Sequence, residues 1–279
     1  MQWGQIKTLF IICFLILDVF LVQQFFEKRE QAQIGLLPDS TIEEQLEAEK
    51  ITLGDLPKES IKETYISARR YVFNDEDQKK LDELENQSYE FFNDETILLS
   101  ELEESVPIDV EASDEDITTK VKDQILYGDN YEYWGYNKEA NKLLFFQSYK
   151  NNPIFFNESG VVIVFLNEDQ EMTRYVQTML DDFNKTGEKQ ELIKPKQAAI
   201  TLFSRNELYN GDNVSDMNLG YYTLVPLSNG LQVFAPTWKI LVNEERQYYV
   251  NAMEGQLISM DESTFVEDTI QNLLDQIEQ

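Results

Sequence analysis

A single apolar run near the start of the chain constrains its architecture more than any other feature. Residues 8–26 read TLFIICFLILDVFLVQQFF. As an α-helix, these 19 residues reach about 28 Å, close to the thickness of the hydrocarbon layer of a bilayer. Asp18 lies near the midpoint, where a carboxylic acid costs several kcal/mol unless it is neutral, paired or facing another helix. The run therefore predicts a transmembrane helix that meets a partner inside the membrane.

The residues around the run argue against its cleavage as a signal peptide. A signal peptide has a shorter apolar region and ends at a small-x-small cleavage site. Here EKREQAQ follows, and its first small residue, Ala32, has only polar neighbours. Cys13 lies inside the run and is followed by Phe14, so the pattern of lipoprotein processing is missing as well. We therefore expect an uncleaved anchor.

The flanking charges do not fix which way the anchor crosses. Cytoplasmic ends carry an excess of Lys and Arg. Lys7 and the amino terminus stand on one side, and Lys28 and Arg29 on the other. Orientation therefore has to come from another source.

Helical spacing groups the residues three, four and seven positions from Asp18 on its own face. The partner-binding stripe predicted in this way consists of Ile11, Phe14, Leu15, Asp18, Leu21, Val22 and Phe25. Small residues for close backbone contact are lacking, so a GxxxG pair is not indicated. The alternative is that Asp18 is protonated and merely tolerated by the lipid.

Composition limits the partners and the chemistry of the rest of the chain. The formal charge is −29, from 23 basic and 52 acidic residues, which excludes binding to the phosphates of nucleic acid. Histidine is absent and Cys13 is the single cysteine. The commonest general base, nucleophile pairs and zinc ligands are therefore missing, so we expect no catalytic, cofactor-binding or metal-binding residues. Hydrolysis by a pair of carboxylates stays open, although no pair stands out.

The chain after the anchor divides by composition and pattern. Residues 27–114 form an acidic membrane-proximal segment, for which we expect a solvated stalk with a few docked elements. Within it, Asn74 predicts the cap of a helix that runs through Leu84, and Ser113 begins an S-x-x-D cap of a helix that runs to Leu126. Residues 115–183 and 195–260 each read as a helix followed by aromatic and β-branched strands with Asn, Pro and Gly turns. Residues 171–183 have apolar positions at helical spacing and predict a further helix, and residues 261–279 predict a C-terminal helix. The fold class predicted is α+β, with two helix-plus-antiparallel-sheet units.

Two stretches resemble known modules. Residues 145–172 are similar to a pattern in the propeptide domains of extracellular metalloproteases. Residues 238–258 resemble a PepSY-type repeat, and the matching positions are Tyr249, Val250, Asn251, Ala252, Gly255 and Leu257. These resemblances leave open an alternative function, in which the chain is an extracellular propeptide-like inhibitor of a protease.

The chain as a whole resembles YycI (WalI) proteins of the YycH/YycI family of Gram-positive bacteria. Trp3 and the run at residues 14–21 carry this resemblance. It implies a regulatory protein of the cell membrane with a single transmembrane helix, residues 1–7 in the cytoplasm and an extracellular α+β domain. It also implies two partners bound through transmembrane helices, a sensor histidine kinase of the YycG/WalK type and the sister protein YycH (WalH). The two-component system concerned controls cell-wall metabolism, and the direction of the effect on the kinase stays open.

Overall fold

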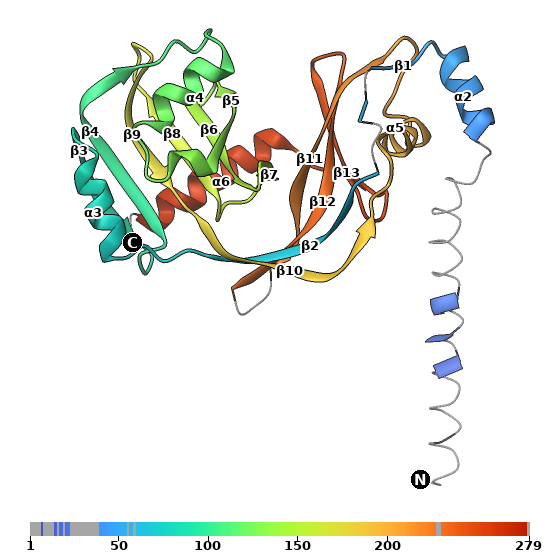
Figure 1. Ribbon diagram of the computed structural model, residues 1–279, viewed down its shortest axis with the longest axis horizontal. Helices are drawn as coiled ribbons and strands as arrows, with labels where there is room; N and C mark the ends of the chain where they lie inside the picture. The colour runs from blue at the N-terminus through green and yellow to red at the C-terminus, as the bar shows by residue number, and fades with distance from the viewer. Residues whose placement is uncertain are drawn as a thin grey trace.

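The computed structural model describes residues 7, 14–15, 17–18, 20–22, 39–54, 56–57, 60–226 and 230–277. Its body has two lobes, which lie side by side and are joined by two long strands (Figure 1). We call residues 71–179 together with the C-terminal helix the first lobe. The described residues of 39–70 and 180–258 are the second lobe. Both lobes combine helices with mainly antiparallel strands, which confirms the predicted α+β class.

The sheet of the second lobe is built around one long strand, β12 (Leu231–Val242). β11 (Asn213–Pro226) pairs with one edge of β12. On the other edge lie β2 (Lys62–Arg70) and, further along, β13 (Arg246–Asn251). The remaining strands are β10 (Leu180–Glu191) beside β2, β1 (Thr52–Leu53) beside β11, and β14 (Leu257–Ile258) beside β13.

Two helices cover one face of this sheet, α2 (Asp39–Ala48) and α5 (Pro195–Ser204). Leu46 of α2 and Leu202 of α5 pack in one core with Trp238 and Ile240 of β12. Because side chains alternate along a strand, Lys239 faces the opposite side of the sheet. That side faces the first lobe.

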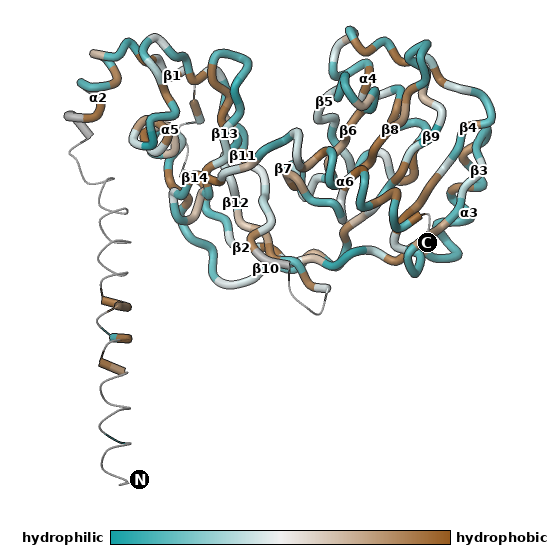
Figure 2. Tube along the Cα trace, turned by 180° about the vertical axis from the view of Figure 1, so that it is seen from behind, coloured by the Kyte–Doolittle hydropathy of each residue, from teal (hydrophilic) through white to brown (hydrophobic). Residues whose placement is uncertain are grey.

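The first lobe has an antiparallel sheet in the order β3-β4-β9-β8-β6-β5. Its strands are β3 (Gln87–Phe92), β4 (Ile97–Pro107), β5 (Tyr131–Asn137), β6 (Lys142–Tyr149), β8 (Val161–Leu166) and β9 (Glu171–Gln177). The short β7 (Asn152–Phe155) forms a hairpin with β6. β8 reads VVIVFL and is apolar along its length in Figure 2, because both faces of the sheet are covered by helices.

α3 (Asp75–Glu83) and α4 (Asp114–Lys122) lie on one face of this sheet, and α6 (Glu262–Ile277) lies on the other. A short 3₁₀ turn, η2 (Gly128–Asn130), precedes β5. The predicted helix starts are confirmed at two places. Asn74 caps α3 in a reciprocal capping box with Asp77, and the Ser113 hydroxyl accepts a hydrogen bond from the backbone N–H of Asp116 at α4.

The first lobe is an insertion between two paired strands of the second. The chain leaves the second lobe at the end of β2 and returns to it at the start of β10. Arg70 and Leu180 are register partners there, and the next N–H, of Tyr71, donates to the carbonyl oxygen of Met179 at 2.7 Å. The entry and exit of the first lobe are therefore hydrogen-bonded neighbours.

The lobes meet again where β7 pairs in parallel with β11, with Ile154 beside Tyr221. This approach requires glycine at position 220. A Cβ at Gly220 would lie 2.3 Å from a ring carbon of Phe155 and 2.6 Å from the carbonyl oxygen of Pro153. Any side chain there would force the two strands apart.

The helix predicted at residues 171–183 is wrong, because this segment forms β9 and the start of β10. Met172, Tyr175 and Val176 are all buried, but Tyr175 packs in the core under α3 and α4, whereas Val176 packs in the core under α6. A strand that is buried on both faces has neighbouring apolar residues, and its pattern then imitates helical spacing.

The stalk expected within residues 27–114 is also wrong for its described residues. β2 lies inside the sheet of the second lobe, and β4 lies inside that of the first. Three of the five exposed positions of β4 are glutamates, while Ile97 and Leu98 are fully buried. The high net charge of this segment therefore comes from side chains that face solvent. The side chains of the same strands that point inward belong to the hydrophobic cores.

Candidate functional site

The structure describes five of the seven residues of the predicted partner-binding stripe. Phe14, Leu15, Asp18, Leu21 and Val22 are all helical and exposed. The exposed fractions of the four apolar side chains lie between 52% and 60%. Figure 2 shows the described residues of this segment mostly in the apolar colour. Partner binding by this stripe stays a prediction.

Ile11 and Phe25, the two other members of the stripe, lie outside the described residues, as does most of the predicted span at 8–26. Among the residues that the structure describes, none belongs to a helix with the length and apolar character needed to cross a bilayer.

The chain that follows the predicted anchor is tied firmly into the second lobe. Ile42 and Leu46 of α2 are 3% and 5% exposed and pack with the core of that lobe. The N–H of Gly211 donates to the carbonyl oxygen of Glu49 at 2.8 Å, and the N–H of Thr52 donates to that of Asp212 at 2.9 Å. A change in the position of α2 therefore has to be transmitted to the sheet.

Asp212 holds this junction together. Its carboxylate accepts hydrogen bonds from the Arg246 guanidinium, from Asn243 Nδ2 at 2.7 Å and from the Tyr209 N–H at 2.7 Å. Burial alone would raise the pKa of Asp212, but these donors and the positive charge of Arg246 outweigh it and lower the pKa. The carboxylate is therefore held in its charged form.

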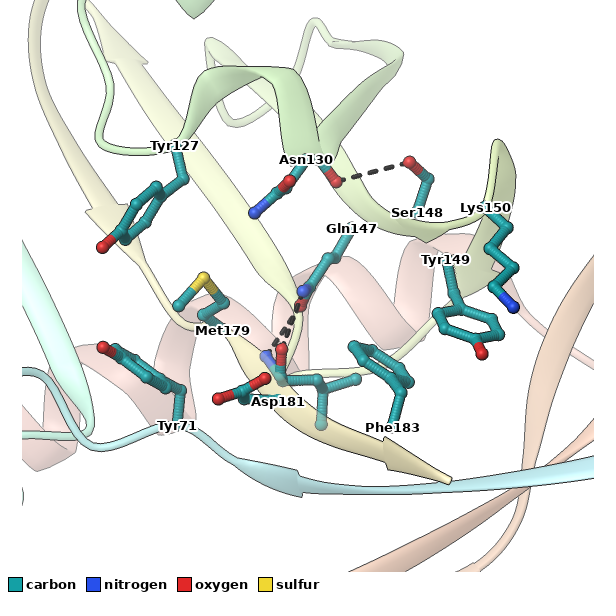
Figure 3. Close-up of a pocket in the computed structure, with 11 residues that line it drawn as sticks. Tyr71, Tyr127, Asn130, Gln147, Ser148, Tyr149, Lys150, Met179, Asp181 and Phe183 are labelled. Carbon is teal, nitrogen blue, oxygen red and sulfur yellow. Dashed lines mark hydrogen bonds between the residues drawn. The ribbon is translucent and has the colours of Figure 1, made fainter. Parts of the chain in front are cut away.

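A second candidate site is the cleft at the crossing between the lobes, about 440 Å³ in volume (Figure 3). Its walls are mainly aromatic and polar, and they come from both lobes. The lining residues are Tyr71, Tyr127, Asn130, Gln147, Ser148, Tyr149, Lys150, Met179, Leu180, Asp181 and Phe183.

One wall of the cleft is set by a buried carboxylate. The hydroxyl groups of Tyr71 and Tyr127 both donate to Asp77, which is 0% exposed. Burial, and then these hydrogen bonds to Asp77, raise the pKa values of both tyrosines, so both phenols stay protonated donors. Asp77 is fully engaged, because it also accepts the N–H of Asn74 at 2.8 Å.

The opposite wall is an aromatic pair with a fixed backbone behind it. Tyr149 and Phe183 stack with ring centroids 4.7 Å apart. Gln147 binds the backbone of Leu180 twice, donating to its carbonyl oxygen at 2.8 Å and accepting its N–H at 2.7 Å. These groups give the cleft flat apolar surfaces and hydrogen-bonding edges, which suit binding.

Sequence reasoning missed this cleft, because its tyrosines are scattered along the chain. The capping pattern at Asn74 places Asp77 at the start of α3, but it does not show which hydroxyl groups reach that carboxylate. Tyr71 and Tyr127 are far apart in sequence, and only the folding of the first lobe brings both hydroxyl groups to Asp77.

Comparison with solved structures gives distant similarities. An uncharacterized protein from Eubacterium rectale is similar with a TM-score of 0.45 and 12% identity, over 76% of this chain and 89% of that one. YycH from Bacillus subtilis is similar with a TM-score of 0.38 and 13% identity, over 76% of this chain and 56% of that one. No curated protein matches the chain. The family model described as YycI protein matches residues 31–253, which is most of the sequence, and the chain therefore belongs to the YycI family.

Proposed function

We propose that the chain is a membrane-anchored accessory protein of a two-component system that controls cell-wall metabolism. It binds the sensor histidine kinase together with the sister protein YycH and modulates kinase activity. Membership of the YycI family carries the proposal, since the match covers residues 31–253. The function is regulatory, without catalysis by this chain, in agreement with its lack of histidine.

The proposal places the protein in the cell membrane with one transmembrane helix at residues 8–26. Residues 1–7 are cytoplasmic, and the lobes are extracellular. The apolar run supports the span, and the family resemblance supports the orientation. Protease added to intact protoplasts should digest the lobes, and full protection of the lobes would reverse this topology.

The stripe around Asp18 supplies the contact with the partner helices in this proposal. Interhelical hydrogen bonds in a membrane are worth roughly 0.6–2 kcal/mol. A kinase poised between two states needs only a few kcal/mol of differential binding to change its population. The ties between α2 and the second lobe give such a contact a mechanical route to the lobes.

Substitution of Asp18 in the full chain tests the proposal. Asp18→Leu should weaken co-purification with the kinase and YycH from membranes and should change the output of the two-component system. Asp18→Asn should be nearly silent, because the amide retains a hydrogen-bonding group. If Asp18→Leu left both the association with the kinase and YycH and the output of the two-component system unchanged, the helix would serve only to attach the protein to the membrane.

Two phenylalanines provide a matched control for the stripe. Phe14 belongs to it, whereas Phe20 is a described helical residue outside it, and both are exposed, at 60% and 55%. Phe14→Ala should weaken association more than Phe20→Ala. Equal effects would show that general hydrophobicity, and not this face, determines binding.

A further inference from the structure

A second cleft, between the lobes, contains a lysine and a glutamate that form no salt bridge with any described residue. Glu132 and Trp134 of β5 lie on one side, and Asn218 of β11 and Lys239 of β12 on the other, with Asn152 of β7 beside them. The cleft has a volume of about 300 Å³, at the lower end of the range for small-molecule sites.

Lys239 lies on the side of β12 that faces away from the core of the second lobe. Its Nζ is 4.0 Å from the centroid of the Trp134 ring. In the described part of the chain, this ammonium group makes no hydrogen bond or ion pair. In a chain with 52 acidic and 23 basic residues, a lysine in a cleft without a carboxylate contact requires an explanation.

Two of the carboxylates that act on this lysine through their charge are engaged elsewhere. Glu262 accepts the indole N–H of Trp134 at 2.9 Å. Asp216 accepts Nδ2 of Asn218 at 2.6 Å and the N–H of Met217 at 2.8 Å. Burial lowers the pKa of Lys239, while Glu262, Asp216 and Asp114 oppose that shift through their negative charge. These carboxylates support the charged amine without contacting it.

The remaining polar groups of the cleft are free to bind a ligand. Glu132 is half-buried, and among the described residues its side chain has no hydrogen bond or ion pair. The side-chain oxygens of Asn152 and Asn218 accept no hydrogen bond from the described residues, although both amide groups donate. The cleft therefore offers one cation, one anion and two amide acceptors, beside the partly exposed apolar surfaces of Trp134 and Pro153.

We propose that this cleft binds a zwitterion the size of an amino acid or dipeptide, with its carboxylate on Lys239 and its ammonium on Glu132. The asparagine oxygens would accept a peptide N–H, and the apolar surfaces would hold a small side chain. A ligand without net charge also escapes the repulsion that a free anion meets near a chain of charge −29. This inference goes beyond the proposed function and does not depend on it.

Calorimetric titration of the full chain in detergent micelles with the dipeptide Ala-Ala tests the proposal. We expect saturable binding at millimolar concentration or below. Lys239→Met, which keeps the length and the apolar stem of the side chain, should weaken it at least tenfold. Lys185→Met removes a lysine on β10 that already pairs with Glu63 at 3.0 Å, and it should leave binding unchanged.

A second variant separates binding from folding. Glu132→Gln should weaken binding of Ala-Ala at least threefold, but it should not lower the affinity for N-acetyl-Ala-Ala, because that probe lacks the ammonium group and loses only a repulsion from the Glu132 carboxylate. A structural defect would lower both affinities together. Absence of saturable Ala-Ala binding, unchanged binding with Lys239→Met, or equal losses for both probes with Glu132→Gln would overturn the proposal.

Discussion

At the scale of single residues, the charged groups that contribute most to stability are those whose hydrogen-bond partners are held in place by the fold. Asp212 is 5% exposed and accepts hydrogen bonds from three donors in the segment that joins α2 to the sheet of the second lobe. Its pKa is lowered in the folded protein. A group of this kind stabilises the fold above its ordinary pKa, and the stability is lost as the pH falls through the folded value.

Asp212→Asn should therefore lower the free energy of unfolding near pH 7 by about 2–3 kcal/mol, because the charge-assisted hydrogen bond with Arg246 is lost. As the pH falls below about 4, from the ordinary pKa of an aspartate toward the lowered folded value, the penalty should shrink, because protonation removes the charge that the unmodified carboxylate presents to Arg246. Urea unfolding of the full chain in micelles, followed by circular dichroism at both pH values, measures this.

The exposed Asp169 offers a matched control for this substitution. Asp169→Asn should change the free energy of unfolding by less than about 0.5 kcal/mol at either pH. A penalty for Asp212→Asn that is the same at both pH values would show that packing, and not charge, holds the junction.

The candidate sites show how far single residues could be predicted. The stripe around Asp18 follows from sequence spacing, because residues of one helix share a face. The clefts do not, since Tyr71 and Tyr127, or Glu132 and Lys239, meet only through contacts between distant parts of the chain.

At the scale of elements, local sequence signals predict where a helix begins better than they predict whether a segment is a helix or a strand. Asn74 and Ser113 mark α3 and α4 correctly, because a cap is made with backbone groups only a few residues away. The spacing in β9 imitates a helix, because burial of this strand on both faces depends on α6, which is more than 80 residues further along the chain. The charge of the acidic segment suggests a stalk for the same reason, since β2 pairs with strands that begin at residue 180 and residue 231.

α6 covers the face of the first-lobe sheet that is opposite to α3 and α4, and its contribution to stability can be measured. Leu273 is 1% exposed and packs with Ile97, Val176 and the other members of that core. Leu273→Ala should lower the free energy of unfolding by about 2–4 kcal/mol, through lost burial and the cavity left behind.

The neighbouring residue Asn272 is exposed and serves as the control for α6. Asn272→Ala should cost less than about 0.5 kcal/mol in the same urea titration. If Leu273→Ala were equally mild, α6 would rest on the sheet without contributing to the stability of the first lobe.

At the scale of the whole molecule, three connections determine the relative position of the two lobes. The crossing at β2 and β10 joins them covalently, and the pairing of β7 with β11 joins them by backbone hydrogen bonds. α6 starts beside the Trp134 side chain and then covers the first lobe. Since α2 is tied to the second lobe, movement of one lobe against the other is a route from either cleft to the predicted anchor.

The pairing of β7 with β11 can be broken at one position without touching either cleft's charged groups. Gly220→Val should push the lobes apart, because its Cβ would lie 2.3 Å from the ring of Phe155. Gly135→Val is the matched control, since a Cβ at Gly135 has no heavy atom within 4 Å. Electron paramagnetic resonance distances between spin labels report the separation, with labels at Glu85→Cys and Glu188→Cys in a Cys13→Ser background.

We expect Gly220→Val to lengthen or broaden the distance distribution between the lobes and Gly135→Val to leave it unchanged. If the proposed function is correct and lobe movement reaches α2, Gly220→Val should also alter the output of the two-component system while Asp18 is intact. A lengthened distance with unaltered output would restrict signalling to the transmembrane helix. If the distance were unaltered, the crossing strands and α6 would be sufficient to fix the relative position of the lobes. The β7–β11 pairing would then be redundant for that position.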